Sequence, residues 1–354
     1  MLQITFRKLK VITLFTGFLL LNIILCLSTL AQETGEALQV CATVPDLGEL
    51  AKEVGGNQVF VTVLARGPED PHFVEAKPGF IKILSQADLL IEIGMDLEVG
   101  WLPVLQKNAR NSKVLTGASG DLDTSKSITP MDVPTGPVDR SMGDVHPAGN
   151  PHYLLDPLNG LKVARLIRDK LIELRPQQAQ LFRDRYASFQ KRVGVALVGE
   201  RLAAKYDFEK LATLFQYGKL EAFLKEQKEE SLLGGWLSEM LPYYGTKAVG
   251  DHNLWPYFTS RFGISVIGLL EPKPGVSPTT KHLSEVVVMI QREGVRIILK
   301  SPYFDPKAAQ FVAEKTGTRI VNMVHQVGAL EGVDDYMAMV NYNVQKLVGA
   351  LRGN

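Results

Sequence analysis

The 354-residue chain has few cysteines and lacks the common signatures of catalysis. Its two cysteines are Cys26, in an N-terminal apolar run, and Cys41, in a strand-like run where a thiol is usually a small apolar side chain. No Gly-rich phosphate loop, His-Glu-x-x-His, Cys-x-x-Cys or Gly-x-Ser-x-Gly occurs. These absences argue against nucleotide hydrolysis, zinc-protease chemistry and a nucleophile elbow, and we do not expect an enzyme.

An excess of either charge is also missing. The chain has 39 basic and 38 acidic residues, and loss of residues 1–31, with three basic residues and no acid, would leave 36 against 38. No basic block and no interleaving of basic and aromatic residues is present. Nucleic acid is therefore not an expected partner.

The N-terminus reads as an export signal. The first ten residues carry three basic side chains and no acid, and residues 11–30 carry no charge. Small residues end the run, which predicts cleavage after Ala31 and a periplasmic or otherwise extracytoplasmic location. The run is long enough to span a bilayer, so an uncleaved membrane anchor remains an alternative. Ile24-Leu25 before Cys26 argues against a lipoprotein signal.

Two α/β lobes are expected after the signal. Short apolar β-branched runs alternate with helical patterns in residues 38–120, and the alternation resumes at 247. Continuous apolar strands favour parallel sheets covered on both faces by helices. The predicted strands are 38–44, 59–65, 88–94 and 113–115 in the first lobe, and 247–250, 265–270, 295–300 and 319–324 in the second.

The middle of the chain predicts a connection between the lobes. Residues 119–150 are rich in Gly, Pro, Ser, Thr and Asp and are expected to be a loop. A helix from Gln177 to about Tyr206, with interior glycines at 194 and 199, would be roughly 40 Å long. The predicted organisation is a signal peptide at 1–31, an N-terminal lobe at 32–157, linking helices at 158–206, and a C-terminal lobe at 207–354 with a helical insertion at 207–244.

Four of the six histidines fall at predicted strand-to-helix transitions: His72, His152, His252 and His325. The carboxyl ends of parallel strands form the ligand crevice of open α/β sheets, so these side chains are expected to converge from two lobes. Neutral imidazole is a favoured Zn²⁺ ligand at about 2.0–2.1 Å, and four of them close a tetrahedral site suited to capture. The competing interpretation is that each histidine is a loop or cap residue.

Other polar residues near these positions have less certain roles. His146 is either an accessory metal ligand or a plain loop histidine, and His282 falls within a predicted helix, where a solvated face is expected. Asp70 and Asp156 each precede a proline, where aspartate often caps a turn. Their alternative role is to orient a histidine ligand through its second ring nitrogen.

These segments resemble the metal-binding solute receptors of high-affinity zinc and manganese ABC transporters. The likeness extends over almost the whole chain after the signal. It rests on Asp70-Pro71-His72, on Asn150-Pro151-His152-Tyr153-Leu154-Leu155-Asp156-Pro157, on His252 with Trp255 and Tyr257-Phe258, and on Glu271-Pro272-Lys273-Pro274-Gly275.

The resemblance implies two α/β lobes joined by one long rigid helix, with the metal in the cleft between them. It also implies delivery of the ion to a membrane permease that has a separate ATPase subunit, and we expect the receptor to be a monomer. The family usually has aspartate as its fourth ligand, where this chain has Val324-His325-Gln326. Four imidazoles favour Zn²⁺ over Mn²⁺, which prefers carboxylate oxygen; if His325 does not bind, water or Asp70 takes its place.

Three functions therefore stand at this point. The first is a Zn²⁺ receptor of an ABC importer, with Mn²⁺ as the alternative ion. The second is an exported adhesin or zinc chaperone with the same fold, because a fold does not fix a function. The third is a metallohydrolase, which would need an open coordination position and a general base.

Overall fold

The computed structural model describes residues 36–136, 138, 145–273 and 275–353. Leu38–Asn354 form one compact unit that contains both lobes. The predicted signal peptide, with its cleavage site and the anchor alternative, lies outside the described residues. Among the residues that are described, none belongs to a helix both long enough and apolar enough to cross a bilayer.

The N-terminal lobe is built on a four-stranded parallel sheet with strand order β2-β1-β3-β4. Its central strand β1 is almost wholly buried, as a parallel strand covered on both faces should be. The strands are β1 (Leu38–Ala42), β2 (Val59–Val63), β3 (Leu89–Glu92) and β4 (Asp121–Asp123), and the helices are α2 (Pro45–Gly55), α3 (Pro78–Gln86) and α4 (Leu102–Ala109).

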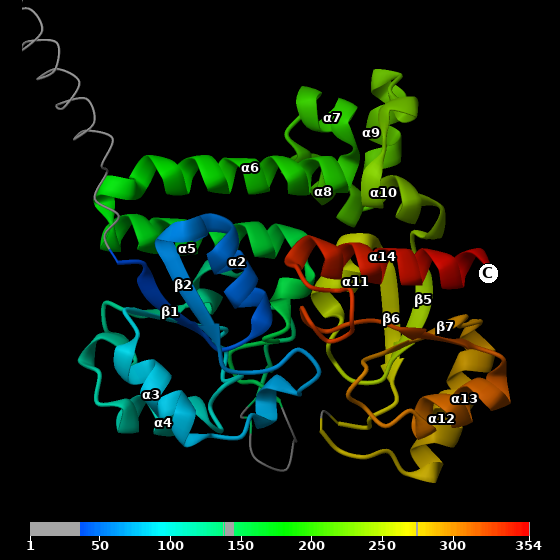
Figure 1. Ribbon diagram of the computed structural model, residues 1–354. Helices are drawn as coiled ribbons and strands as arrows, with labels where there is room; N and C mark the ends of the chain where they lie inside the picture. Colours follow the sequence, from blue (N-terminus) through cyan, green and yellow to red (C-terminus); the bar gives the residue numbers. More distant parts are fainter. Residues whose placement is uncertain (1–35, 137, 139–144, 274, 354) are drawn as a thin grey trace, which may run out of the picture. The chain divides into compact units, whose positions relative to one another are not determined.

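The C-terminal lobe repeats this topology with strand order β6-β5-β7-β8, again all parallel. Two parallel sheets flanked by helices confirm the predicted α/β class (Figure 1). The strands are β5 (Thr246–Gly250), β6 (Ile264–Leu269), β7 (Ile297–Lys300) and β8 (Arg319–Asn322), and the helices are α11 (Pro256–Phe262), α12 (Thr280–Glu293), α13 (Lys307–Thr316) and α14 (Tyr336–Arg352).

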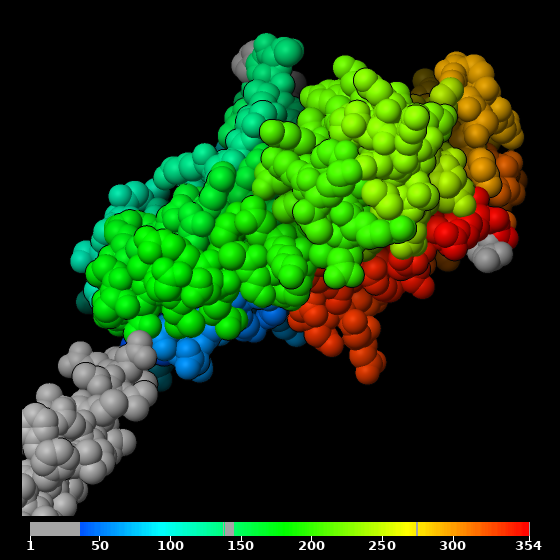
Figure 2. All heavy atoms as spheres, turned by 90° about the horizontal axis from the view of Figure 1, so that it is seen from above, coloured from blue at the N-terminus to red at the C-terminus, as the bar shows by residue number. Residues whose placement is uncertain are grey.

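The helices that stand between the two sheets in the sequence pack against one another and gather on one face of the molecule, in green in Figure 2. Helix α6 packs against α2 of the N-terminal lobe and also against α8 and α10 next to the C-terminal lobe. It therefore links the lobes, as the long connecting helix was expected to do. The group comprises α5 (Pro157–Leu174), α6 (Ala179–Val198), α7 (Glu200–Lys205), α8 (Phe208–Gln216), α9 (Leu220–Gln227) and α10 (Gly235–Met240).

The predicted continuous helix to Tyr206 is wrong at Gly199. Helix α6 ends at Val198, so its 20 residues span roughly 30 Å instead of 40. Gly199 has φ 82° and ψ 159°, a conformation that only glycine adopts readily. A Cβ atom at this position would lie 2.8 Å from the Cα atom of Gly234, so the close approach of the two backbones requires glycine and interrupts the helix.

The fourth strand of the N-terminal lobe is also displaced from its predicted position. Ser112–Val114 form a 3₁₀ turn, and the strand is β4, within the 119–150 segment that the sequence predicts as loop. β4 is Asp-Leu-Asp, and its single apolar residue, Leu122, gives too little pattern to predict a strand. The strand exists because β3 supplies an edge, with Leu90 opposite Asp121 and Glu92 opposite Asp123.

Candidate metal centre

Four imidazole rings come together between the lobes. The ring centroid of His72 lies 5.2 Å from those of His146 and His152 and 6.3 Å from that of His252, and the rings of His152 and His252 are 6.2 Å apart. A cavity of about 50 Å³ is lined by three of these histidines, His146, His152 and His252.

Each lobe brings its own segment to this cluster. His72 lies in the 3₁₀ turn Pro71–Phe73 after β2, and the buried Trp101 anchors this turn by donating its indole N–H to the Pro71 carbonyl at 3.0 Å. His252 follows β5 of the C-terminal lobe. The His152 segment is tied to it, because Asn150 accepts from the His152 amide at 3.0 Å and donates to the Asn253 carbonyl at 2.7 Å.

Asp70 orients His72. Its Oδ1 lies 2.7 Å from His72 Nδ1 and also accepts from the His72 main-chain amide at 3.0 Å. Burial would raise the pKa of Asp70, but the hydrogen bonds and the charge of His72 outweigh it and lower that pKa overall. With Nδ1 engaged, the His72 ring presents Nε2 to the cluster, which is the arrangement found in metal-ligating histidines.

Glu271 does the same for His252, a role that the sequence did not assign. Its Oε2 lies 2.6 Å from His252 Nδ1, and the ring of Phe304 stacks on the His252 ring at 5.1 Å. The only available signal was that Glu271 opens the Glu-Pro-Lys-Pro-Gly segment that resembles the metal receptors. Sequence separation from His252 gave no indication that the two side chains meet.

The remaining two rings are held neutral. Burial and the neighbouring histidines lower the pKa of His152 well below its usual range, and burial with the charge of His72 lowers that of His146 to about 4. His146 also donates to the main chain of Met95, which adopts φ 51° beside Gly94 and Asp96 in the left-handed region. Neutral imidazoles are the form that binds a metal ion.

His325 has hydrogen-bond partners outside the four rings. Its Nε2 is 3.1 Å from the Glu69 carbonyl, its Nδ1 is 3.4 Å from Ser301 Oγ, and its ring meets the edge of Tyr303 at 4.4 Å. It lines a separate space of about 30 Å³, which it shares with His152. Burial lowers its pKa to about 4. Its neighbour Gln326 places Nε2 within 2.9–3.0 Å of the carbonyls of Arg66, Gly67 and Glu69, the loop that leads to His72.

Two further residues have structural partners instead of the cluster. Asp156 caps the first turn of α5 and binds Arg261 through both carboxylate oxygens, so in this structure it orients no histidine. His282 is half-buried, with its Nε2 3.1 Å from the Leu269 carbonyl, so its predicted solvated face is only partly exposed.

Two rings of the cluster stand at a spacing that would suit a shared ion. His72 Nε2 and His146 Nε2 are 3.1 Å apart, close to the roughly 3.3 Å that separates two nitrogens sharing a tetrahedral Zn²⁺. Within the described ranges, no three His, Cys, Asp or Glu side chains stand in an arrangement that could hold a metal ion as they are. Ring rotation would therefore accompany binding.

The fold, together with the family and the relatives that the sequence matches, identifies a metal-binding solute-binding protein, a transport component and not an enzyme. The chain belongs to the family described as zinc-uptake complex component A, periplasmic, whose pattern matches residues 40–196 and 228–350. The stretch between these matches, residues 197–227, contains the whole of α7, α8 and α9.

Relatives agree with this assignment over most of their length. The manganese-binding lipoprotein MntA of Halalkalibacterium halodurans is 23% identical over 325 residues, 90% of each chain. The zinc-binding protein TroA of Treponema pallidum is 21% identical and covers 88% of each chain. A crystal structure of ZnuA has the same fold, with a TM-score of 0.64 and 20% identity over 89% of this chain and 99% of that one.

Proposed function

We propose that this protein captures a divalent transition-metal ion, with Zn²⁺ favoured over Mn²⁺, and delivers it to the permease of an ABC importer driven by a separate ATPase subunit. The observation that carries the proposal is the meeting of four imidazoles from both lobes, with His72 Nε2 and His146 Nε2 3.1 Å apart. The relatives named for manganese and for zinc support a divalent cargo.

The proposed ligands are His72, His146, His152 and His252. The sequence predicts His325 as the fourth ligand, but His146 is favoured because its ring contacts His72, whereas both ring nitrogens of His325 face protein oxygens. The two carboxylates nearest the cluster, Asp70 and Glu271, are engaged with the outer nitrogens of His72 and His252. An all-nitrogen ligand set favours Zn²⁺, since Mn²⁺ prefers carboxylate oxygen.

Export supports the same role. A receptor that feeds an importer works outside the cytoplasmic membrane, and several relatives are named lipoproteins, among them MntA of Halalkalibacterium halodurans. We therefore propose an extracytoplasmic protein, acting as a monomer that docks on its permease. The sequence of residues 1–31 fits export through a signal peptide.

The deciding experiment is competitive titration of the metal-free protein with Zn²⁺ and Mn²⁺, with bound metal counted per chain. One tightly bound Zn²⁺ per chain is expected, with Mn²⁺ at least tenfold weaker. His152→Ala should weaken Zn²⁺ binding at least tenfold, while the control His282→Ala, outside the cluster, should leave it unchanged. No tight binding of either ion would refute the proposal.

Growth separates the importer role from an adhesin or a zinc chaperone. Deletion of the gene is expected to prevent growth when zinc is chelated, and added zinc should restore it. Normal growth of the deletion strain under chelation would contradict the importer role even if the purified protein binds zinc.

A further inference from the structure

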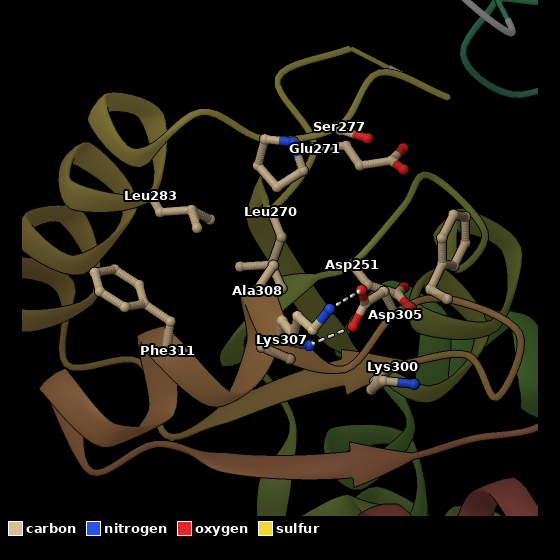
Figure 3. Close-up of a pocket in the computed structure, with 13 residues that line it drawn as sticks. Asp251, Leu270, Glu271, Ser277, Leu283, Lys300, Asp305, Lys307, Ala308 and Phe311 are labelled. Atoms are coloured by element: carbon tan, nitrogen blue, oxygen red, sulfur yellow. Dashed lines mark hydrogen bonds and ion pairs between the residues drawn. The ribbon is translucent and has the colours of Figure 1, made fainter.

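A second cavity lies in the C-terminal lobe, next to His252 of the candidate metal centre. It has a volume of about 410 Å³, within the roughly 300–1,000 Å³ of small-molecule sites. Figure 3 shows apolar side chains, among them Leu283 and Phe311, on one side and the charged residues Asp251, Asp305 and Lys300 on the other. The space is therefore amphipathic, and it is much too large for a single metal ion.

The cavity occupies the place where open α/β sheets bind ligands. Its lining includes Asp251 after β5, Leu270 after β6 and Lys300 at the end of β7, all at carboxyl ends of strands. In the order β6-β5-β7-β8 the chain passes from β5 to its neighbour β6 on one side and from β7 to its neighbour β8 on the other side, so the direction of winding changes between β5 and β7. Ligands of open sheets bind in the crevice at such a switch point.

The carboxylates that line the cavity already accept hydrogen bonds from main-chain amides. Asp251 accepts from the main-chain amides of Ser301 at 2.6 Å and His252 at 2.8 Å. Glu271 accepts from the Gly275 amide at 2.9 Å in addition to its contact with His252. Asp305 caps α13 by accepting from the Lys307 amide at 3.0 Å. Each of these carboxylates therefore already has a hydrogen-bond donor from the main chain.

Lys300 differs from them. The residue is only 5% exposed, and its ammonium donates to the Ser301 carbonyl at 2.7 Å. An ammonium has three N–H donors, and in the described part of the chain this is the one hydrogen bond recorded for it. Burial lowers the pKa of Lys300, while the charges of Asp251 and Asp305 act to raise it. A buried ammonium with donors to spare favours an anionic partner.

We propose that this cavity is a second binding site, which takes a small carboxylic acid with an apolar body. The carboxylate binds the Lys300 ammonium, and the apolar body lies against Leu270, Leu283 and Phe311. The opposite orientation would place an amine among acids that are already hydrogen-bonded, and a wholly apolar ligand would give the remaining N–H donors of the Lys300 ammonium no acceptor.

The cavity is lined in part by the residues that position His252. Glu271, Phe304 and Asp251 all line the cavity, and each also contacts His252 through its ring or its main chain. A bound acid therefore changes the setting of a proposed metal ligand. This coupling rests on the proposed metal function, whereas binding of the acid does not.

The test uses the whole protein without metal and three probes that share one body: 4-fluorobenzoate, 4-fluorobenzylamine and fluorobenzene, followed by fluorine NMR titration. The benzoate should saturate one site, with the amine and the neutral ring at least tenfold weaker. Lys300→Met should weaken the benzoate at least tenfold, and Lys315→Met, on the exposed surface of α13, should leave its affinity unchanged.

A second variant guards against a folding defect in Lys300→Met. Ala308→Phe fills the cavity and keeps Lys300, and it too should abolish benzoate binding. The proposal is overturned by an absence of benzoate binding, by stronger binding of the amine, or by benzoate affinity that survives in both variants. Saturation with benzoate should also shift Zn²⁺ affinity by the same factor by which Zn²⁺ shifts benzoate affinity. Loss of zinc binding alone would leave the benzoate result intact.

Discussion

Arg261 on α11 donates two hydrogen bonds to Asp156, the residue that caps α5. Its Nε lies 2.9 Å from Oδ1, and its Nη2 lies 3.0 Å from Oδ2. Both side chains are less than a tenth exposed, and Arg261 also donates to the Ala212 carbonyl at 3.0 Å. The pair joins the C-terminal lobe to the first linking helix, directly after the His152 segment. It therefore ties α11 to the start of α5.

We predict that breaking this pair costs much more stability than breaking an exposed one. Arg261→Met leaves the buried carboxylate of Asp156 without its partner and should lower the free energy of unfolding by about 3–5 kcal/mol. The control is Arg292→Met, which removes an exposed pair with Glu293 and should change it by less than about 1 kcal/mol. Urea unfolding of both variants measures the difference, and equal losses would contradict it.

The fourth ligand can be identified by exchanging two histidines separately. His146→Ala should weaken Zn²⁺ binding at least tenfold, because it removes a ring in contact with His72. His325→Ala should leave it within about threefold. His325→Asp offers the converse test: an unchanged ratio of Zn²⁺ to Mn²⁺ affinity is expected, and a shift toward Mn²⁺ would show that His325 binds the ion after all.

Glu271→Gln tests the orienting role of the carboxylate. Loss of the charge weakens the hydrogen bond between Oε2 and His252 Nδ1, which is 2.6 Å long. Changes of this kind in the groups that hold metal-ligating histidines cost roughly 10–100-fold in metal affinity. Titration with Zn²⁺ should show such a loss with thermal stability preserved, and Glu285→Gln on the exposed face of α12 is the control. Equal affinities in the two variants would remove Glu271 from the site.

The pH dependence of stability should be altered by Asp46. Burial raises the pKa of Asp46 to about 7 from an ordinary value near 4, although hydrogen bonds from its own amide and that of Val327 act to lower it. The folded protein therefore holds a proton that the unfolded chain has lost between about pH 4 and 7, so this group's contribution to stability falls as pH rises through that window.

Asp46→Asn removes this titration. Relative to the wild type, the variant should gain stability on going from pH 5 to pH 8, by an amount on the order of a few kcal/mol. Urea unfolding at both pH values gives the comparison. Parallel pH dependence in the two proteins would mean that Asp46 titrates normally in the fold.

Gly199 should be far less tolerant of a side chain than another glycine with positive φ. Gly317 has φ 73° and open space where a Cβ would stand, so Gly317→Ala should cost about 1–2 kcal/mol from backbone conformation alone. Gly199→Ala adds a clash with the Gly234 backbone at 2.8 Å and should cost clearly more. Thermal unfolding of both variants decides, and equal costs would show that α10 shifts freely.

Sequence patterns were sufficient for most of the fold because they reflect burial. Apolar runs located β1, β2 and β3 within the predicted strands 38–44, 59–65 and 88–94. The pattern failed where tertiary contacts decide. The break at Gly199 depends on the backbone of Gly234, and β4 depends on an edge offered by β3.

The candidate site was predicted in part for the same reason. Position after a strand located His72 and His252, which follow β2 and β5, whereas His152 lies far beyond β4, in the turn that precedes α5. The sequence ranked His325 above His146 because His325 follows a predicted strand, whereas His146 lies in a loop and the pattern does not say how near that loop comes to His72. The partner of Asp156 was unpredictable, since Arg261 is 105 residues away along the chain.

The hydrogen bonds of Gln326 connect the two lobes next to His72. Its amide holds the carbonyls of the loop that leads to His72, although this loop follows a strand of the N-terminal lobe and Gln326 belongs to the C-terminal one. Any separation of the lobes must either break the hydrogen bonds of Gln326 to this loop or move the loop, with His72, away from His152. A permease that separates the lobes would thereby also separate the proposed ligands, so that opening of the cleft and release of the ion become one event.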